Sequence, residues 1–372
     1  ITKNLIYILT RRDLNPDEIE EIKKISADYP IDFEYIYQTS LANGIENLVY
    51  LNIKKYLSDI VPSHITSLFE ERRKIILKNN VLLYKELLYI TNLLKKSNIP
   101  FALIKGLFFT ERLYGDIGAR ISADIDMFVK EKNIAYIKNI LLSNGYNISK
   151  DESLTYGLVF QKKDPVNPIL VEFETNFIRE HPIKNIDYEK DVWDTIQSVQ
   201  LDKYELPILS YENELLYSCL HYFHHFYLYV GSFCIQYPEF KWLCDINVFI
   251  NRYGRNINWL SFTDRCKKYS LSNIIYYIFL QAKMYLKTPI PGPIFLKLKP
   301  STIRYFMIKL LISETLCKNG HNQNSIYRYI IIYYKNVLLY FSLIPVYMIL
   351  LRFKRVIKFH ILLFKGLLFK KA

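Results

Sequence analysis

The sequence predicts an α+β protein in which a small mixed β-sheet is flanked by helices, with further helical regions at the N-terminal and C-terminal ends. Three observations support this fold class. A long segment with apolar residues at helical spacing ends at Asn98-Ile99-Pro100. Short apolar runs bounded by turn residues follow it, as is typical of strands. Helical periodicity then returns from Ser210 onward.

These changes of pattern divide the chain into four regions. A chain of 372 residues exceeds the usual size of one domain, and its 51% apolar content is ample for a packed core. We therefore expect a helical lead-in over residues 1–75, a sheet-containing core over 76–205, a helical domain over 206–320 and a basic, apolar tail over 321–372.

The expected helices of the first two regions can be placed individually. The longest begins at Pro62-Ser63 and runs to about Lys96, with a core-facing stripe of Leu and Ile side chains. A shorter one follows Lys105-Gly106 and covers 107–114. Another covers 132–143 and ends at Ser143-Asn144-Gly145, a sequence that stops helices well.

The strands are expected between and after these helices, at 101–104, 125–129, 156–162 and 168–175. Pro165-Val166-Asn167-Pro168 has the composition of a hairpin loop. The last two strands should therefore be antiparallel neighbours.

Positive charge is concentrated at the C-terminal end. The formal net charge is +13, yet no acidic residue follows Glu314, and ten lysines and arginines do. The rest of the chain is close to balanced, at about +3. Residues 336–351 are sixteen uncharged positions, fewer than the roughly 20 that a membrane span needs. Basic and apolar residues alternate after them, so residues 325–372 are typical of a segment that docks on an anionic membrane surface.

Two other interpretations of the tail remain open. Nucleic acid would also attract so many positive charges, but the continuous Ile, Leu and Phe content is poorly suited to a phosphate-binding arm. The tail could equally be a basic helical end packed on the core. The five cysteines show no Cys-x-x-Cys pairing, and the N-terminus shows no signal-peptide pattern. We therefore expect a cytoplasmic protein, at the inner face of the membrane if the tail binds lipid.

The segment Ser122-Ala123-Asp124-Ile125-Asp126 runs into an apolar strand. Residues i and i+2 of a strand share a face, so the carboxylates of Asp124 and Asp126 project side by side. Two negative charges held that close persist most readily when a cation lies between them. A strand, the Lys105-Gly106 turn, a helix and then an Asp-x-Asp strand form the layout of a metal-dependent nucleotidyl-transfer site.

This region resembles a bacterial group within the DNA polymerase β-like nucleotidyltransferase superfamily, usually called the uncharacterised nucleotidyltransferase family. The resemblance covers roughly residues 75 to 300. It is most specific in Leu103-Ile104-Lys105-Gly106, Leu113-Tyr114-Gly115-Asp116, Gly118-Ala119-Arg120 and Asp124-Ile125-Asp126. It continues more weakly through Val171-Glu172-Phe173-Glu174, Leu220-His221 and Lys241-Trp242-Leu243-Cys244-Asp245.

The resemblance implies an enzyme that moves a nucleoside monophosphate from a nucleoside triphosphate (NTP) to an unknown acceptor and releases pyrophosphate. Two Mg²⁺ ions would activate the nucleophile and stabilise the leaving group. Asp124 and Asp126 would supply the first two ligands, and Glu172 on a neighbouring strand the third. Glu174 competes for that role because it shares the face of Glu172, at a position where relatives usually carry His.

Three further residues are candidates for binding the phosphates. Gly106 would let the backbone approach them at a helix N-terminus, and Lys105 and Arg120 would supply positive charge. Superfamily members often have Gly-Ser or Gly-Gly at this turn, whereas this chain has Gly106-Leu107. This departure favours an alternative function, a non-catalytic nucleotide-binding accessory protein on the same fold.

The histidines His221, His224 and His225 lie on an expected helix. They lack the spacing and neighbours of a zinc site, so a packed or hydrogen-bonded cluster is expected, with His221 as a candidate contact to the acceptor. Trp242 and Asp245 are expected to serve helix packing and capping.

Overall fold

The structure, a computed structural model, describes residues 2–150, 157–162, 168–177, 186–201, 203–231, 240–311, 338 and 342–344. The predicted basic tail, residues 321–372, and the predicted hairpin loop at 165–168 therefore lie almost entirely outside the described residues. Within the described ranges, no helix is both long enough and apolar enough to cross a membrane.

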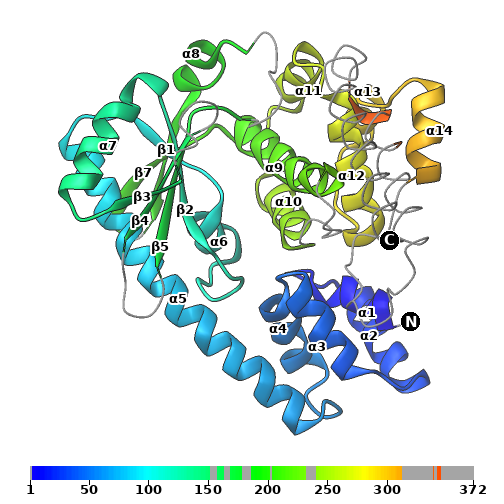
Figure 1. Ribbon diagram of the computed structural model, residues 1–372. Coiled ribbons are helices and arrows are strands. Elements are labelled where there is room, and N and C mark those ends of the chain that lie inside the picture. Colours follow the sequence, from blue (N-terminus) through cyan, green and yellow to red (C-terminus); the bar gives the residue numbers. More distant parts are fainter. Residues whose placement is uncertain are drawn as a thin grey trace, which may run out of the picture.

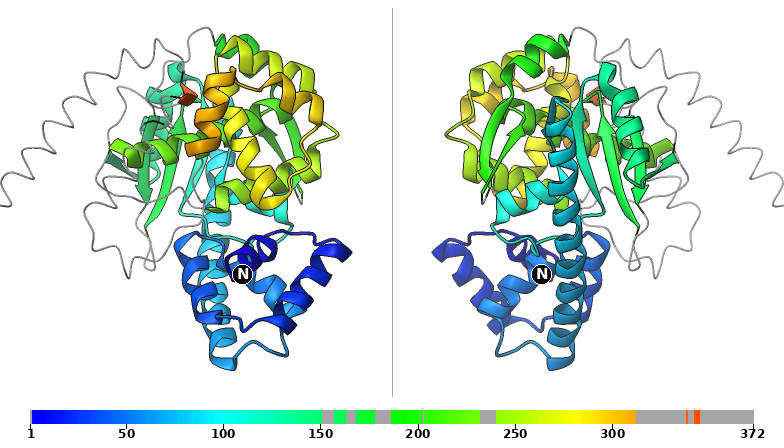
Figure 2. Two further views of the ribbon diagram at one scale, coloured as in Figure 1. Left: turned by 90° about the vertical axis from the view of Figure 1, so that its right-hand side faces the viewer. Right: turned by 90° about the vertical axis from the view of Figure 1, so that its left-hand side faces the viewer.

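The N-terminal region is helical, as predicted, and consists of α1 (Thr2–Leu9), α2 (Pro16–Asp28), α3 (Phe33–Ala42), α4 (Glu46–Tyr56) and the first part of α5 (Ser63–Lys96). Helix α2 begins with a capping box, in which the Asn15 side chain accepts from the Glu18 amide and the Glu18 carboxylate accepts from the Asn15 amide. Helix α5 has the predicted bounds. It continues past residue 75 and connects the lead-in to the core (Figures 1 and 2).

The core is a seven-stranded mixed sheet in the order β3-β4-β5-β2-β1-β7-β6. Its strands are β1 (Phe101–Leu103), β2 (Asp124–Val129), β3 (Asn147–Lys150), β4 (Gly157–Lys162), β5 (Ile169–Glu174), β6 (Gln197–Leu201) and β7 (Tyr204–Ile208). The helices between them are α6 (Gly106–Tyr114), α7 (Ile134–Ser143) and α8 (Tyr188–Asp191). The four predicted strands are confirmed, and β4 and β5 are antiparallel as expected.

Strands β3, β6 and β7 were not predicted from the sequence, and the reasons can be identified. Strand β3 has four residues and an irregular register with β4. Strand β6 is mostly polar and exposed, and β7 contains Pro207, which argues against a strand interior. Leu206 and Ile208 of β7 do alternate into the core shared with α5, but this alternation is short and Pro207 interrupts it.

Alternation along β2 gives the sheet two different faces. Ile125, Met127 and Val129 point into a core shared with the second half of α5 and with α7. Phe128 points the other way, into the core formed by the helical domain. Because side chains alternate along a strand, Asp124 and Asp126 share the face of Phe128 and point toward the helical domain.

The helical domain that covers this second face comprises α9 (Tyr211–Gly231), α10 (Phe240–Tyr253), α11 (Trp259–Lys268), α12 (Ser272–Leu286), α13 (Gly292–Lys297) and α14 (Thr302–Leu311). In Figure 1 its helices lie on the opposite side of the sheet from α7. The candidate site therefore lies between the sheet and α9 and α10.

Candidate functional site

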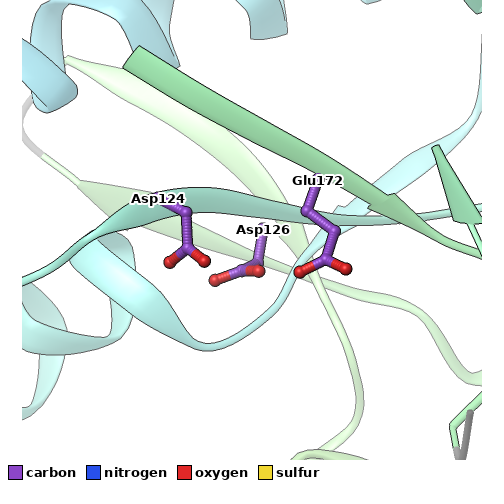
Figure 3. A group of neighbouring side chains, drawn as sticks. All are labelled: Asp124, Asp126 and Glu172. Carbon is purple, nitrogen blue, oxygen red and sulfur yellow. The ribbon is translucent and has the colours of Figure 1, made fainter. Parts of the chain in front are cut away.

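Three carboxylates meet on adjacent strands (Figure 3). Strands β2 and β5 are parallel neighbours, and their register places Asp126 opposite Glu172. Asp124 lies two residues before Asp126 on the same face. One ligand oxygen from each of the three side chains lies within 4.8 Å of those of the other two. The structure thus brings together the three residues that the sequence singled out as metal ligands.

Asp126 is the most buried of these three, with 3% of its surface exposed. Its Oδ2 atom accepts no hydrogen bond from the described residues, and its Oδ1 atom lies 3.2 Å from the Lys105 ammonium. Burial, and then the neighbouring Asp124 charge, raise the pKa of Asp126 well above its ordinary value, while Lys105 acts in the opposite direction. A buried carboxylate with an unpartnered oxygen is suited to receiving a cation.

Gly106 leaves the space beside this oxygen open. It has φ of +72°, and a Cβ atom placed there would lie 3.0 Å from Asp126 Oδ2 and 3.4 Å from the Asp124 carbonyl oxygen. Gly106 is also the first residue of α6, whose N-terminal amides favour anions. The turn therefore requires glycine both for its backbone conformation and for access to the carboxylates.

We expect Gly106→Ala to impair the site more than it destabilises the fold. The left-handed backbone should cost about 1 kcal/mol for a residue with a Cβ atom, measurable as a lower free energy of unfolding. The methyl group would also crowd Asp126 Oδ2, so Mn²⁺ affinity should fall by about tenfold or more, the factor that corresponds to 1.4 kcal/mol. The control is Gly145→Ala, at another glycine with positive φ but with no atom near the added Cβ. Equal Mn²⁺ affinity in the two variants would contradict this role of Gly106.

Lys105 sits among the acids rather than at the surface. Its Nζ atom lies 2.9 Å from Glu174, 3.2 Å from Asp126 and 3.9 Å from Glu172. Burial alone would lower the pKa of Lys105, but the Asp126 and Glu174 charges raise it well above its ordinary value. The amine therefore remains protonated and offsets part of the negative charge of the cluster. His221 Nδ1 lies 3.4 Å from the same Nζ atom.

The two glutamates of β5 have different surroundings. Glu174 Oε1 accepts from Lys105 at 2.9 Å, and Glu174 Oε2 accepts from the Tyr217 hydroxyl at 2.6 Å. Both oxygens of Glu174 are thus used within the protein. Glu172 groups with the two aspartates instead. This geometry favours Glu172 over Glu174 as the third ligand.

Arg120 lines the same cavity but is anchored away from the carboxylates. Its Nη2 atom lies 2.9 Å from Asp245 on α10, and its Nη1 atom donates to the Ile121 carbonyl. The Tyr114 hydroxyl donates to the other oxygen of Asp245 at 2.8 Å. Asp245 therefore connects α6, the loop before β2 and the helical domain, a role beyond the helix packing and capping expected from sequence.

The cavity above the carboxylates has a volume of about 360 Å³. Its far wall comes from α9 and α10 and is aromatic and basic, with Tyr217, His221, His224, His225, Lys241 and Trp242. The His225 and Trp242 rings stack with centroids 4.2 Å apart, and His221 meets Trp242 edge-on at 5.0 Å. The expected packed histidine cluster is present, and it lies in the wall of the cavity.

Tyr217, Lys241 and Trp242 were not identified as site residues from sequence. Tyr217 lies one helical turn before His221, so the shared helix face was the available signal. Lys241 and Trp242 follow a segment outside the described residues, and nothing local indicated that α10 faces the strands.

Comparison with known proteins agrees with the resemblance seen in the sequence. No curated protein matches the chain. A solved structure that is similar to it is an antigenic nucleotidyltransferase-like protein from Paracoccidioides brasiliensis, with 15% identity. That match covers 61% of this chain and 97% of the other, with a TM-score of 0.31, which is too low to carry a structural argument. The family model described as uncharacterised nucleotidyltransferase matches residues 29–287, well over half of the chain and further toward the N-terminus than the resemblance suggested. The chain therefore belongs to the uncharacterised nucleotidyltransferase family.

Proposed function

We propose that this protein is a Mg²⁺-dependent nucleotidyltransferase that moves a nucleoside monophosphate from an NTP to an acceptor and releases pyrophosphate. The observation that carries the proposal is the convergence of Asp124, Asp126 and Glu172 beside the Gly106 turn. Family membership supports the class of reaction.

The donor set fits Mg²⁺. This ion prefers carboxylate oxygens, and the site offers three carboxylates, an unpartnered Asp126 oxygen and a glycine that keeps the approach to it open. We propose that Asp124, Asp126 and Glu172 hold two ions. When bound, Mg²⁺ would neutralise the triphosphate and make the acceptor oxygen a better nucleophile.

The protein's own groups would bind and orient the nucleotide. The N-terminal amides of α6 favour the negative phosphate groups, and Gly106 lets these groups come close. Lys105 adds a protonated amine beside them, held in position by Glu174. The aromatic and basic wall of α9 and α10 encloses the opposite side of the cavity and would exclude water from the reacting groups.

The proposal is tested by following label from α-labelled nucleoside triphosphates in the presence of Mg²⁺, with cell extract as the source of acceptor. Wild type should transfer label to an acceptor, and EDTA should stop the transfer. Asp264→Asn, at an exposed acid of α11, is the matched control for the site variants. Tight nucleotide binding with no transfer would instead support a non-catalytic accessory protein, which the Gly106-Leu107 turn favours.

Docking of residues 325–372 on an anionic membrane surface stays a prediction, as does a location at the inner face of the membrane. It can be checked separately from transfer by deleting the chain after Asn324. The truncated protein should lose binding to anionic liposomes and keep its transfer activity. Retained liposome binding would place the lipid contact elsewhere.

The position of Lys105 among the acids leads to another prediction. In Lys105→Met the cation that competes for Asp126 and Glu172 is gone, so Mn²⁺ affinity should rise by about tenfold. Nucleotide affinity should fall by about tenfold, because a charge contact to the phosphates is lost. Mn²⁺ titration and nucleotide titration measure the two effects, with Lys132→Met at an exposed site as the control. A parallel fall in both affinities would contradict competition between Lys105 and the metal.

A further inference from the structure

A second cavity lies away from the carboxylates and has a volume of about 510 Å³. It is formed by the segment after α1, the start of α2, the last part of α10 and the end of α12. Its charged lining consists of Arg11, Arg12, Arg252 and Lys287, with the acids Asp13 and Glu18. The cavity thus carries an excess of positive charge at the junction of the lead-in and the helical domain, a place where ligand pockets commonly occur.

The two acids offset only two of the four positive charges in the lining. Glu18 is buried and forms an ion pair with Arg11, so it neutralises that residue alone. Arg11 is itself only 6% exposed, and its Nε atom has no hydrogen-bond partner among the described residues. The lining of the cavity thus includes a buried guanidinium with an N–H that no acceptor among the described residues satisfies.

Arg12 and Arg252 converge on one atom. Each donates from Nη1 to the Leu113 carbonyl oxygen, at 2.7 Å and 2.6 Å respectively. One cation is enough to complement the C-terminal end of α6. The second guanidinium places two positive charges close together, and they repel each other. An anion bound between them would remove this repulsion.

We infer that this cavity binds a phosphate-bearing small molecule. Guanidinium groups match phosphate oxygens with paired N–H donors, and the cavity has room for more than a single phosphate group. The site is distinct from the carboxylate site, because the two cavities share no lining residue. Gly106 at the start of α6 lies beside Asp126, whereas the carbonyl oxygen of Leu113 near its end accepts from Arg12 and Arg252. The inference does not depend on the proposed transferase activity.

The test is calorimetric titration of the full chain in EDTA with inorganic phosphate, pyrophosphate, a nucleoside monophosphate and a sugar phosphate. At least one of these should bind, and the ranking among them separates a free phosphate ligand from a nucleotide or sugar ligand. Arg252→Gln and Arg12→Gln should each weaken binding about tenfold or more. Arg255→Gln, at an exposed arginine beyond the cavity, should leave it unchanged.

Two further variants make the test independent of folding and of the carboxylate site. Lys287 is exposed and contacts Glu21 only at 3.5 Å, so Lys287→Gln should fold normally and still weaken binding measurably. Lys105→Met should leave the binding of inorganic phosphate and of the sugar phosphate to this cavity unchanged. The inference is overturned if none of the four compounds binds the folded wild type. It is also overturned if binding survives all three cavity variants, or if the binding of inorganic phosphate and of the sugar phosphate is lost in Lys105→Met.

Discussion

Asp124→Asn is expected to reduce Mg²⁺-dependent label transfer by about a thousandfold or more, because a metal ion contributes several kcal/mol of transition-state stabilisation. Asparagine keeps the size of the side chain but removes one of three charges that meet within 4.8 Å. The pKa of Asp126 is raised by burial and then by Asp124, so the same change should also relieve repulsion in the metal-free protein.

Two opposite effects therefore identify the role of Asp124. In EDTA the melting temperature of Asp124→Asn should rise by roughly 1–3 °C, since repulsion of about 1 kcal/mol is lost. We expect Mg²⁺ to raise the melting temperature of wild type, and this increase should be absent in the variant. Thermal unfolding with and without Mg²⁺ measures both, beside the transfer assay and the Asp264→Asn control. A variant that is less stable in EDTA but still responds to Mg²⁺ would show that Asp124 is structural.

The placement of the carboxylates on one face of each strand could be predicted from the sequence, because it depends on local structure. Asp124 and Asp126 share a face through the two-residue period of a strand, and Glu172 has the same property on β5. Only the pairing of β2 with β5 had to be supplied by the fold, and its register places Glu172 opposite Asp126.

The remainder of the site depends on contacts between residues distant in the chain. Lys105 meets Glu174 and His221, which lie 69 and 116 positions later. No local pattern encodes such contacts. Likewise β6 and β7 pair with each other, and β7 also pairs with β1, which lies about a hundred positions earlier in the chain.

The ion pair between Arg120 and Asp245 could not be predicted from the sequence. The phosphate-binding role suggested by the sequence stays a prediction. In the structure the Arg120 side chain is 4% exposed and paired with Asp245, whose side chain is 5% exposed. Burial raises the pKa of Asp245, and Arg120 acts against that rise. The pair lies 125 positions apart in the sequence, so its geometry follows from how α10 packs on the loop before β2.

Asp245→Ala is accordingly expected to lower the free energy of unfolding by about 3–5 kcal/mol, the usual loss when one partner of a buried ion pair is removed. The change leaves the Arg120 guanidinium charged and buried, and it also removes the acceptor of the Tyr114 hydroxyl. Urea denaturation followed by circular dichroism gives the value. Glu212→Ala provides a control that should lose far less, because this half-buried carboxylate on α9 accepts from the Asn258 amide and lies near the surface.

The double variant Arg120→Met, Asp245→Leu separates a structural role from phosphate binding. Replacing both charges with apolar side chains should recover much of the lost stability, because no unpaired charge remains in the interior. If the pair serves only to hold α10 against the loop before β2, the nucleotide affinity of this folded variant should stay within about threefold of that of wild type. A tenfold change would correspond to about 1.4 kcal/mol. A loss of tenfold or more in a variant with restored stability would instead establish that Arg120 contributes directly to holding the triphosphate. We expect the first result, because both Nη atoms of Arg120 already have partners within the protein.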